Sequence, residues 1–394
     1  MAPGPRPFDI VHVSSAHPWT DNRVHLREAA SAAAAGYRTA LLAVTDDGRT
    51  DPDWSRPDEV TGVYVRRVPR RPRVQRMVCS SMQVVLGALS SRAGVVHLHD
   101  PELVWAVPLL RMLGRKVVYD AHEDLPQQVA GKEYLGRLGR TVGAAAAHGV
   151  LITARGASAV VAATPAIAER FPPEHTRIVR NVPRLRIADA AAVPVSHRPA
   201  NVVYLGALSR DRGLHVVTGL AARAVGTGLP FGWGVVTAGP VDGAVDRREF
   251  DRLVAAGTID HRGVLPPVAA RDLLHEARVG LLPLLPTPAY AASLPTKLFE
   301  YLAAGLPVIA TDVPLWRDLL AGADCATWVP PGDVDAVLRA IHRYDADPDL
   351  LEAHSASGRA LVGRAYRWDD EERALLDLYR ELHGATPFHR HEGI

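Results

Sequence analysis

The stretch Ser293–Thr311, SLPTKLFEYLAAGLPVIAT, carries the signals of a loop, a helix and a buried strand in close succession. Pro295 and Thr296 stand where a helix can begin, and apolar residues with helical spacing follow them. Gly305 and Pro307 then come where such a helix would end. The last four residues are short, apolar and preceded by proline, which is typical of a core strand. The stretch therefore predicts loop, helix and core strand, in that order.

The first turns of this predicted helix carry one cation, Lys297, and one carboxylate, Glu300. The N-terminus of a helix attracts anions, because its free N–H groups and its dipole point toward them. A carboxylate one turn further in can accept two hydrogen bonds from a ribose diol. These features favour a site for a sugar diphosphate. The alternative is an amphipathic helix in which Lys297 forms an ordinary salt bridge with a neighbour.

The segment S-L-P-T-K-L-F-E-Y-L-A-A-G-L-P-V-I-A resembles the nucleotide-sugar motif of the retaining family 4 glycosyltransferases. The resemblance implies an α/β protein of the GT-B fold, with two facing Rossmann-like domains, parallel sheets and an interdomain cleft. In that family the motif has two glutamates separated by seven residues. The second holds the donor ribose, and Glu300 takes its place, with Thr296, Lys297 and Leu298 beside the donor. The first glutamate would fall at Ala292, so this chain lacks a contact near the sugar ring.

Length and composition indicate an ordinary globular protein with room for two domains. The chain has 394 residues, of which 47% are hydrophobic and 22% charged, and its net charge of +2 gives no reason to expect nucleic acid as a partner. Cys79 and Cys325 lack metal-site spacing, so we expect both to be buried and reduced. The start lacks the apolar run of a signal peptide, and no run approaches the roughly 18 apolar residues of a membrane span. These features favour a cytoplasmic protein.

The N-terminal half begins with the rhythm of a doubly wound parallel sheet. A strand, a helix and a strand are predicted at 9–14, 24–35 and 37–44. The sequence D-N-R-V-H-L-R-E-A before and within this helix resembles the first βα unit of family 4 enzymes, which implies that Asp21, Asn22 and Arg23 face the cleft and bind the acceptor. The alternatives are helix capping, for which Asp21 is well placed, and solvated charge.

Two further strands of this half end in clusters of polar residues. Residues 95–99 end in His99 and Asp100, and residues 116–119 are followed by D-A-H-E-D. The motifs H-L-H-D-P-E-L and V-V-Y-D-A-H-E-D resemble the acceptor-domain motifs of family 4. The resemblance implies that His122 lies against the donor sugar and assists its reaction, and that His99 and Asp100 contact the acceptor. The alternative is that these histidines and carboxylates only tie loops together.

A basic stretch, RRVPRRPRVQRM, places six arginines between Arg66 and Arg76. It could make peripheral contact with an anionic membrane, as in some family members, or receive a phosphorylated acceptor. The alternative is a solvated loop, and the prolines argue against a regular amphipathic helix here.

The second half opens with a strand at 201–205, the loop GALSRDRG and a helix at 214–224, an arrangement suited to phosphate binding. Family 4 enzymes have G-R-L-x-x-x-K-G at this point, and its two cations grip the diphosphate. After Gly206 this chain has Ala207 in the first cationic position and Arg212 in the second, with Arg210 able to replace the missing charge. Arg212 and Lys297 are therefore the pair expected to stabilise the leaving diphosphate.

The remaining elements of the second half continue the alternation. Strands are predicted at 234–239, 259–264 and 279–283, and helices at 268–277, 332–345 and 350–366. In the family the turn matching G-V-L-P presents backbone groups to the nucleobase, so Val264 and Leu265 would line a uracil pocket, with guanine as the alternative base. The amphipathic segment 368–382 resembles the family's final helix, which crosses back onto the first domain.

These predictions combine into one domain plan and one reaction. The plan has an acceptor domain, a linker, a donor domain, a returning helix and a flexible tail, at 1–190, 191–200, 201–366, 367–384 and 385–394. The reaction is transfer of a hexose or amino-hexose from a UDP-linked donor, with retention, and His122, Arg212 and Lys297 take part in catalysis. The nucleotide sugar is a co-substrate and no resident cofactor is expected. Since no Asp-x-Asp motif follows a cleft strand, no metal is expected either.

Two other functions remain open at this level. A GT-B epimerase or hydrolase would turn over the donor without an acceptor. A catalytically idle partner subunit would bind nucleotide sugar without turnover, and Ala207 and Ala292 favour it. A dehydrogenase is disfavoured, because no G-x-G-x-x-G follows the first strand. The acceptor can be a glycan, a glycolipid or a small natural product, and the oligomeric state is undetermined. The expected location is cytoplasmic, with peripheral contact at the inner membrane face through Arg66–Arg76 as an option.

Overall fold

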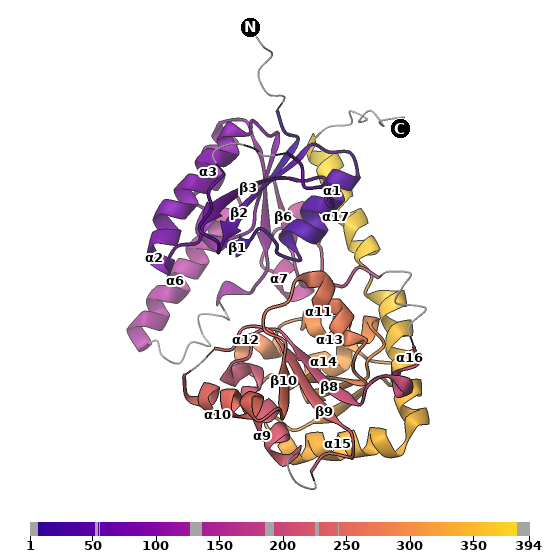
Figure 1. The fold of residues 1–394 in the computed structure, drawn as a ribbon. Coiled ribbons are helices and arrows are strands. Elements are labelled where there is room, and N and C mark those ends of the chain that lie inside the picture. The colour runs from indigo at the N-terminus through magenta and orange to yellow at the C-terminus, as the bar shows by residue number, and fades with distance from the viewer. Residues whose placement is uncertain are drawn as a thin grey trace. The chain divides into compact units, whose positions relative to one another are not determined.

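The protein divides into two compact units in a computed structural model (Figure 1). One unit comprises the chain through Asn181 together with the chain from Trp368 onward, and the other comprises Val182–Arg367. The structure describes residues 7–51, 54, 56–126, 136–185, 193–224, 228–242 and 244–383. Each unit is built on its own parallel sheet.

The first unit contains a seven-stranded sheet in the order β3-β2-β1-β4-β5-β6-β7, with every neighbouring pair parallel. Its strands are β1 (Ile10–Pro18), β2 (Thr39–Thr45), β3 (Tyr64–Pro69), β4 (Val95–Leu98), β5 (Lys116–Ala121), β6 (Ala159–Ala162) and β7 (Thr176–Ile178). Its α-helices are α1 (Ala30–Ala34), α2 (Arg73–Gln75), α3 (Ser81–Ser90), α4 (Ala106–Met112), α6 (Arg137–Ala154), α7 (Pro165–Ala168) and α17 (Trp368–His383). Shorter helical segments are η1 (Val24–Ala29) and η2 (Arg76–Ser80), both π-helical, and η3 (Pro101–Leu103) and η4 (Pro173–His175).

Helices cover both faces of this sheet, which explains why its central strands are apolar on both sides. On one face the side chains of α3, α4 and α6 join a core cluster that includes Val85, Leu110 and Leu151. On the other face α17 packs through Trp368 and Tyr379, whose side chains are fully buried against the sheet. The last helix of the second half of the sequence thus completes the first unit, and it is the yellow helix in Figure 1.

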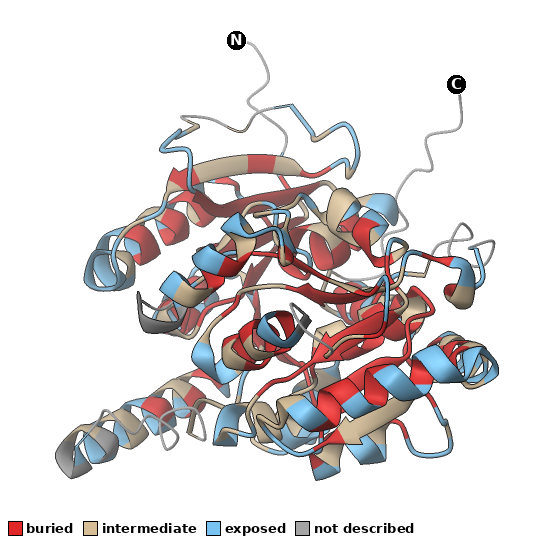
Figure 2. Cartoon of the chain, turned by 60° about the horizontal axis from the view of Figure 1, so that its bottom comes forward, coloured by how far each residue is buried: buried red, intermediate tan, exposed pale blue. Residues whose placement is uncertain are grey.

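The second unit contains a six-stranded parallel sheet in the order β10-β9-β8-β11-β12-β13. Its strands are β8 (Asn201–Leu205), β9 (Gly234–Ala238), β10 (Ile259–His261), β11 (Val279–Leu282), β12 (Val308–Thr311) and β13 (Ala326–Val329). Its α-helices are α9 (Leu214–Ala224), α10 (Ala244–Ala255), α11 (Pro267–Leu274), α12 (Pro288–Ala291), α13 (Thr296–Ala303), α14 (Pro314–Leu319), α15 (Val334–Ala346) and α16 (Pro348–Ala365), with 3₁₀ turns η5 (Val195–His197) and η6 (Arg210–Arg212). Figure 2 shows buried residues along the strands and exposed residues on the outer sides of the helices.

The stretch Ser293–Thr311 folds as its sequence predicts, with a helix, α13, followed by a core strand, β12. Gly305 adopts a φ of 74°, the left-handed conformation that a residue after a helix end often requires. Tyr301 is fully buried, and its hydroxyl accepts a hydrogen bond of 2.9 Å from the backbone N–H of Leu205, at the end of β8. The motif helix is therefore fixed directly to the neighbouring central strand.

Two predictions about local structure are wrong. A helical run begins at Arg73, directly after Pro72, and continues to Ser90, because a proline at the helix N-cap loses no hydrogen bond. Cys79 is exposed on η2 rather than buried, whereas Cys325 is buried as expected. Both cysteines are free thiols.

We expect Gly280→Ala to lower the melting temperature, because Gly280 lets the Tyr301 ring pack directly on β11. A Cβ atom at Gly280 would lie 2.5 Å from Cδ2 of Tyr301. Overpacking of this kind costs about 1–3 kcal/mol. The matched control is Gly149→Ala on α6, where nothing lies within 4 Å of the added atom. Differential scanning fluorimetry of both variants tests the contact, and equal melting temperatures would contradict it.

Candidate functional site

Both sheets reverse their strand order at one point, and polar residues follow the strands there. In the first unit the reversal lies between β1 and β4, and in the second between β8 and β11. Ligands of doubly wound sheets bind at such points, beyond the carboxyl ends of the strands. The predicted acceptor residues follow β1 and β4, and the predicted catalytic His122 follows β5. The predicted diphosphate residues follow β8 or begin α13.

Asp100 joins the C-terminal part of β1 to the loop that follows β4. Its Oδ2 accepts hydrogen bonds of 2.9 Å from Ser14 Oγ, 2.6 Å from the Ser15 backbone N–H and 3.2 Å from the Ala16 backbone N–H. Its Oδ1 lies 3.5 Å from His17 Nε2. The side chain is buried, so the carboxylate fixes the loop that borders the candidate site. Its predicted contact with an acceptor remains a prediction.

Asp120 is the centre of the site in the first unit. Its carboxylate accepts two hydrogen bonds from Arg23, 3.1 Å from Nε and 2.8 Å from Nη2. His99 Nδ1 lies 3.1 Å and His122 Nε2 2.5 Å from Asp120 Oδ2. Burial would raise the pKa of Asp120, but Arg23, His122 and His99 outweigh it and hold the pKa well below its usual range. The side chain is therefore an ionised carboxylate that orients both histidines.

The predicted acceptor residues of the first loop have clear structural partners. Arg23 is buried, and besides Asp120 it donates to the backbone carbonyl of Val179 at 2.9 Å. Asp21 caps the following helical segment, because its Oδ1 accepts hydrogen bonds of 2.8 Å from the backbone N–H groups of Arg23 and Val24. Asn22 is exposed. The structure thus shows capping by Asp21, and acceptor binding by these three residues remains a prediction.

A chain of buried polar side chains continues from His99 to the C-terminal helix. His99 Nε2 lies 2.9 Å from His12 Nδ1, and His97 Nδ1 lies 2.7 Å from the hydroxyl of Tyr379 on α17. Burial lowers the pKa of both His12 and His97 well below the usual value, so both imidazoles are neutral. His12 and His97 are paired in register on β1 and β4, which explains their contact.

Glu28 is a buried carboxyl group beside these histidines. Its Oε1 is 3.0 Å from Arg23 Nε, whose N–H is donated to Asp120, and its Oε2 is 3.9 Å from Nδ1 of both His97 and His99. Burial and the neighbouring Asp120 raise the pKa of Glu28 well above its usual value. Of these two neighbouring carboxyl groups, Glu28 therefore holds its proton more tightly than Asp120 does.

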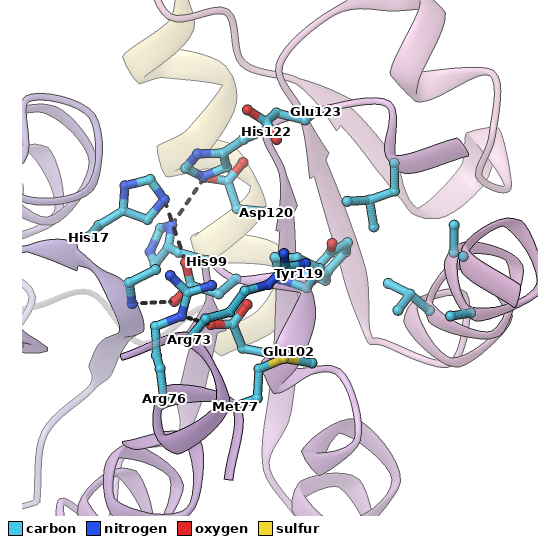
Figure 3. Close-up of a pocket in the computed structure, with 18 residues that line it drawn as sticks. His17, Arg73, Arg76, Met77, His99, Glu102, Tyr119, Asp120, His122 and Glu123 are labelled. Carbon is cyan, nitrogen blue, oxygen red and sulfur yellow. Dashed lines mark hydrogen bonds and ion pairs between the residues drawn. The ribbon is translucent and has the colours of Figure 1, made fainter. Parts of the chain in front are cut away.

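A cavity of about 560 Å³ in the first unit opens in front of Asp120 (Figure 3). Its lining residues come from the ends of β1, β4 and β5, from α2–η2 and from α6. They are Ala16, His17, Arg73, Arg76, Met77, His99, Asp100, Pro101, Glu102, Tyr119, Asp120, His122, Glu123, Leu125, Gly143, Ala146, Ala147 and Val150. Three residues that the sequence singled out, His99, Asp100 and His122, thus line one cavity, and their predicted roles remain predictions.

His17 supplies a positive charge at this cavity. Burial lowers its pKa, but the hydrogen bond with Asp21 and the charge of Asp100 outweigh burial and raise the pKa to about 9. Its ring lies 5.1 Å, centroid to centroid, from the ring of His122. A charged His17 therefore faces the histidine that the sequence assigns to catalysis.

In the second unit, Gly206 and Lys297 are in close contact. Gly206 has a φ of 114°, and a Cβ atom there would lie 2.4 Å from Cε of Lys297. Burial, and then the charge of Arg212, lower the pKa of Lys297 to about 8, against the opposing effect of Glu300. The ammonium group lies 5.5 Å from the centroid of the Tyr204 ring. The residues predicted to bind diphosphate and ribose are thus brought to one place.

Arg212 is oriented by Tyr290, a residue that the sequence analysis did not single out. Its Nε donates a hydrogen bond of 2.9 Å to the Tyr290 hydroxyl on α12. Two of the other predicted donor residues differ in exposure, with Val264 exposed and Leu265 partly buried. Arg210 is exposed on η6. Thr296 begins α13. The side chain of Leu298 is fully buried in the core, so only the backbone of Leu298 is available for a contact with the donor.

Two groups of described side chains offer metal-type ligands. They are His12, Glu28, His97 and His99, and His99, Asp120 and His122, with ligand atoms within 4.8 Å of one another in each group. Imidazoles and carboxylates of this kind suit Zn²⁺. However, Asp120 and His99 are already joined to each other and to further partners by hydrogen bonds. The expected absence of a catalytic metal therefore remains a prediction.

We expect the free energy of unfolding to fall as pH rises above the usual Glu range, because folded Glu28 binds its proton more tightly than the unfolded chain does. The loss is ~1.4 kcal/mol per pH unit between the unfolded and folded pKa values. Glu28→Gln imitates the protonated side chain and should remove this dependence. Urea denaturation between pH 5 and 9 measures it, with the exposed Glu169→Gln as control. An unchanged slope in Glu28→Gln would contradict the assignment.

Comparison with known proteins agrees with this architecture. Residues 22–183 match the family model "Glycosyl transferase 4-like domain", and residues 199–347 match "Glycosyl transferases group 1". The lipopolysaccharide core biosynthesis mannosyltransferase LpsB of Rhizobium meliloti is 27% identical over 166 residues, which cover 38% of this chain and 43% of LpsB. The putative colanic acid biosynthesis glycosyltransferase WcaL of Salmonella typhimurium is 22% identical over 213 residues, which cover 54% of this chain and 52% of WcaL. The chain thus matches about half the length of these curated relatives.

Solved structures share the fold over nearly the whole chain. Sucrose-phosphate synthase from Thermosynechococcus elongatus superposes with a TM-score of 0.72 at 20% identity, covering 97% of this chain and 100% of the other. Anabaena HepE in complex with UDP-glucose superposes with a TM-score of 0.62 at 14% identity, covering 95% and 100%. Residues 22–183 are thus similar to glycosyltransferase 4-like domains and residues 199–347 to group 1 glycosyltransferases, and the chain has the GT-B fold.

Proposed function

We propose that the protein is a retaining glycosyltransferase that moves a hexose or amino-hexose from a UDP-linked donor to an acceptor hydroxyl. The observation that carries this proposal is the cluster formed by Gly206, Arg212, Lys297 and Glu300 at the strand-order reversal of the second unit. The HepE structure, of the same fold, contains UDP-glucose. Both family models that match the chain are glycosyltransferase models.

The roles proposed for the donor-binding residues follow from the charge that develops during the reaction. When the bond from the anomeric carbon to the diphosphate breaks, negative charge develops on the diphosphate oxygens. Arg212, held by Tyr290, and Lys297, confined against Gly206, supply two fixed cations for that charge. Glu300 lies one turn into α13, and in this proposal it accepts hydrogen bonds from the ribose hydroxyls. The acceptor hydroxyl oxygen forms the new bond to the anomeric carbon, and its proton passes to the departing diphosphate.

The acceptor side follows from the orientation of His122. Its Nε2 is directed to the ionised Asp120, which leaves Nδ1 and the ring edge for contacts in the cavity. Asp120 also stabilises positive charge nearby, as an oxocarbenium-like sugar would carry. In this proposal His122 contacts the reacting sugar. His99 positions Asp120, and Asp100 positions the backbone at the end of β1.

We expect Glu300→Ala to weaken nucleotide-sugar binding by at least tenfold and to reduce transfer accordingly, since it removes the ribose acceptor. The matched control is the exposed Glu276→Ala in the same unit. Thermal shift and calorimetry with UDP, GDP, ADP and TDP sugars identify the donor, because a ligand that binds only the folded state raises its melting temperature. Transfer is then followed by product mass and anomeric configuration. Absence of binding by all of them would contradict the proposal, whereas binding without transfer to any acceptor would favour an idle partner subunit.

We expect UDP affinity to fall as pH rises above about 8, because the pKa of Lys297 in the free protein is about 8. A bound diphosphate raises that pKa further, so the affinity falls by up to tenfold per pH unit between the two values. Lys297→Met should bind more weakly and show no such decline. The exposed Lys116→Met is the control and should behave as the wild type. Calorimetric titrations from pH 7 to 9.5 decide it, and an equal decline in Lys297→Met would refute the role of this ammonium group.

The helical run Arg73–Ser90 supports peripheral contact with an anionic membrane. We name its exposed apolar side chains the α2–α3 patch. They are Val74, Met77, Val78, Met82 and Leu86, with exposed fractions between 48% and 76%. Residues spaced by four lie along one face of a helix, and Arg70, Arg71 and Arg73 lie at its N-terminal end. Apolar side chains beside arginines are the pattern of an interfacial helix on anionic lipid. Among the described residues no helix is long and apolar enough to cross a membrane.

We expect the double variant Val78→Glu/Met82→Glu to reduce binding to vesicles of anionic lipid by an order of magnitude or more. Binding of the variant would move two carboxylates from water into the lipid surface, which costs free energy. Phe231→Glu, at an exposed apolar residue of the second unit, is the control and should bind as the wild type. Vesicle co-sedimentation at constant ionic strength measures binding. Equal binding by the wild type and the double variant would remove the membrane contact.

A further inference from the structure

The cavity in the first unit has two chemically different ends. One end is formed by polar residues at the carboxyl ends of β1, β4 and β5, including His17, Asp120 and His122. The opposite wall is formed by one face of α6, through Gly143, Ala146, Ala147 and Val150. These four residues follow the spacing i, i+3, i+4 and i+7, which places them in one row along a helix. Figure 3 shows the labelled polar side chains on the side away from this helix.

The α6 wall offers no hydrogen-bonding side chain. Its four residues are glycine, alanine, alanine and valine, and Leu125 and Met77 are further apolar residues of the cavity lining. Sugar hydroxyls buried against such a wall would lose their hydrogen bonds to water without replacement, which costs free energy. Apolar groups of a ligand, in contrast, gain free energy there in proportion to the area removed from water. The wall therefore selects for hydrocarbon.

The charges around the polar end are balanced. The cationic side chains are His17, Arg73 and Arg76, and the carboxylates are Asp100, Glu102, Asp120 and Glu123. Arg76 Nε lies 2.7 Å from Glu102, and His17 lies 3.5 Å from Asp100. Asp120 is neutralised by Arg23 from behind. A ligand head group with no net charge, but with hydroxyls to bind these paired charges, fits this end best.

The size of the cavity and its surroundings agree with a ligand longer than a sugar. A volume of about 560 Å³ lies within the range of pockets for drug-sized ligands and exceeds the needs of a single sugar ring. Met77 belongs both to the cavity and to the α2–α3 patch, where its side chain is 49% exposed. An apolar chain that leaves the cavity past Met77 would therefore meet an apolar surface rather than water.

We propose that the acceptor is an uncharged amphiphile, with a hydroxyl-bearing head at the His122–Asp120 end and a hydrocarbon tail along the α6 wall. This proposal rests on the proposed glycosyltransferase function for the word acceptor, but the binding site itself does not depend on it. Val150, Ala147 and Ala146 contact the tail, and the polar end holds the hydroxyl that receives the sugar.

The test is a chain-length series in the absence of donor. Methyl, hexyl and octyl glucosides, each below its critical micelle concentration, are titrated into the full chain by calorimetry. Burial of hydrocarbon should tighten binding roughly fourfold for each methylene that the wall covers. Methyl glucoside should bind most weakly. Equal affinity across the series in the wild type would overturn the proposal.

Two neighbouring alanines on α6 supply the matched variants. Ala146 lines the cavity and Ala145 does not, and both are exposed, so a new glutamate is compatible with folding at either position. Ala146→Glu should abolish the gain in affinity with chain length while leaving methyl glucoside unchanged. Ala145→Glu should retain the full gain. A gain that survives in Ala146→Glu, or disappears equally in both variants, would place the tail elsewhere and overturn the proposal.

Turnover separates this proposal from the proposed function. If the protein transfers sugar equally well to methyl and octyl acceptors, as judged by kcat/KM, the function stands and the amphiphile proposal fails. If no transfer occurs but binding still tightens with chain length and depends on Ala146, the amphiphile site stands and the transferase proposal fails. Higher kcat/KM for octyl acceptors, lost selectively in Ala146→Glu, supports both.

Discussion

The buried ion pair between Asp120 and Arg23 is the interaction on which the candidate site of the first unit depends. A carboxylate buried without a partner would take up a proton, and a protonated Asp120 would lose its hold on both histidines. Arg23 prevents this with two hydrogen bonds, and its third contact, to the Val179 carbonyl, ties the loop after β1 to the segment after β7. The ion pair thus joins three parts of the unit, and it leaves Glu28 to carry the proton that two neighbouring carboxylates cannot both lose.

In the second unit, the position of the main cation depends on a glycine of the backbone and not on a buried carboxylate. Lys297, which is proposed to bind the diphosphate, approaches the end of β8 closely, and only glycine leaves room for it at position 206. Tyr301 fixes the helix that carries Lys297 to the same strand. Burial in this position makes Lys297 lose its proton more easily, and its pKa in the free protein is about 8. An anionic ligand would restore that charge, which makes the site responsive to the ligand it is proposed to bind.

The sequence predicts well those parts of the protein whose structure depends on residues close together in the sequence. Ser293–Thr311 carries its helix start, helix end and strand within one short stretch, and Asp333 and Thr164 cap helices where capping residues are expected. The Asp120 network could not be predicted in this way, because Arg23 is 97 residues away in sequence and Tyr379 approaches from α17. Histidines within the apolar strands β1 and β4 were a usable signal, since buried polar residues need partners. The helix after Pro72 was missed because proline at an N-cap and proline in a loop look alike in sequence.

The most direct test of the account is a crystal structure of the protein with the nucleotide sugar that stabilises it most. The account predicts the diphosphate within hydrogen-bonding distance of Arg212 and Lys297, the ribose hydroxyls on Glu300, and the Gly206 backbone alongside the phosphates. Binding of the nucleotide away from this cluster, with Lys297 still confined between Gly206 and the Tyr204 ring and making no contact with phosphate, would contradict it.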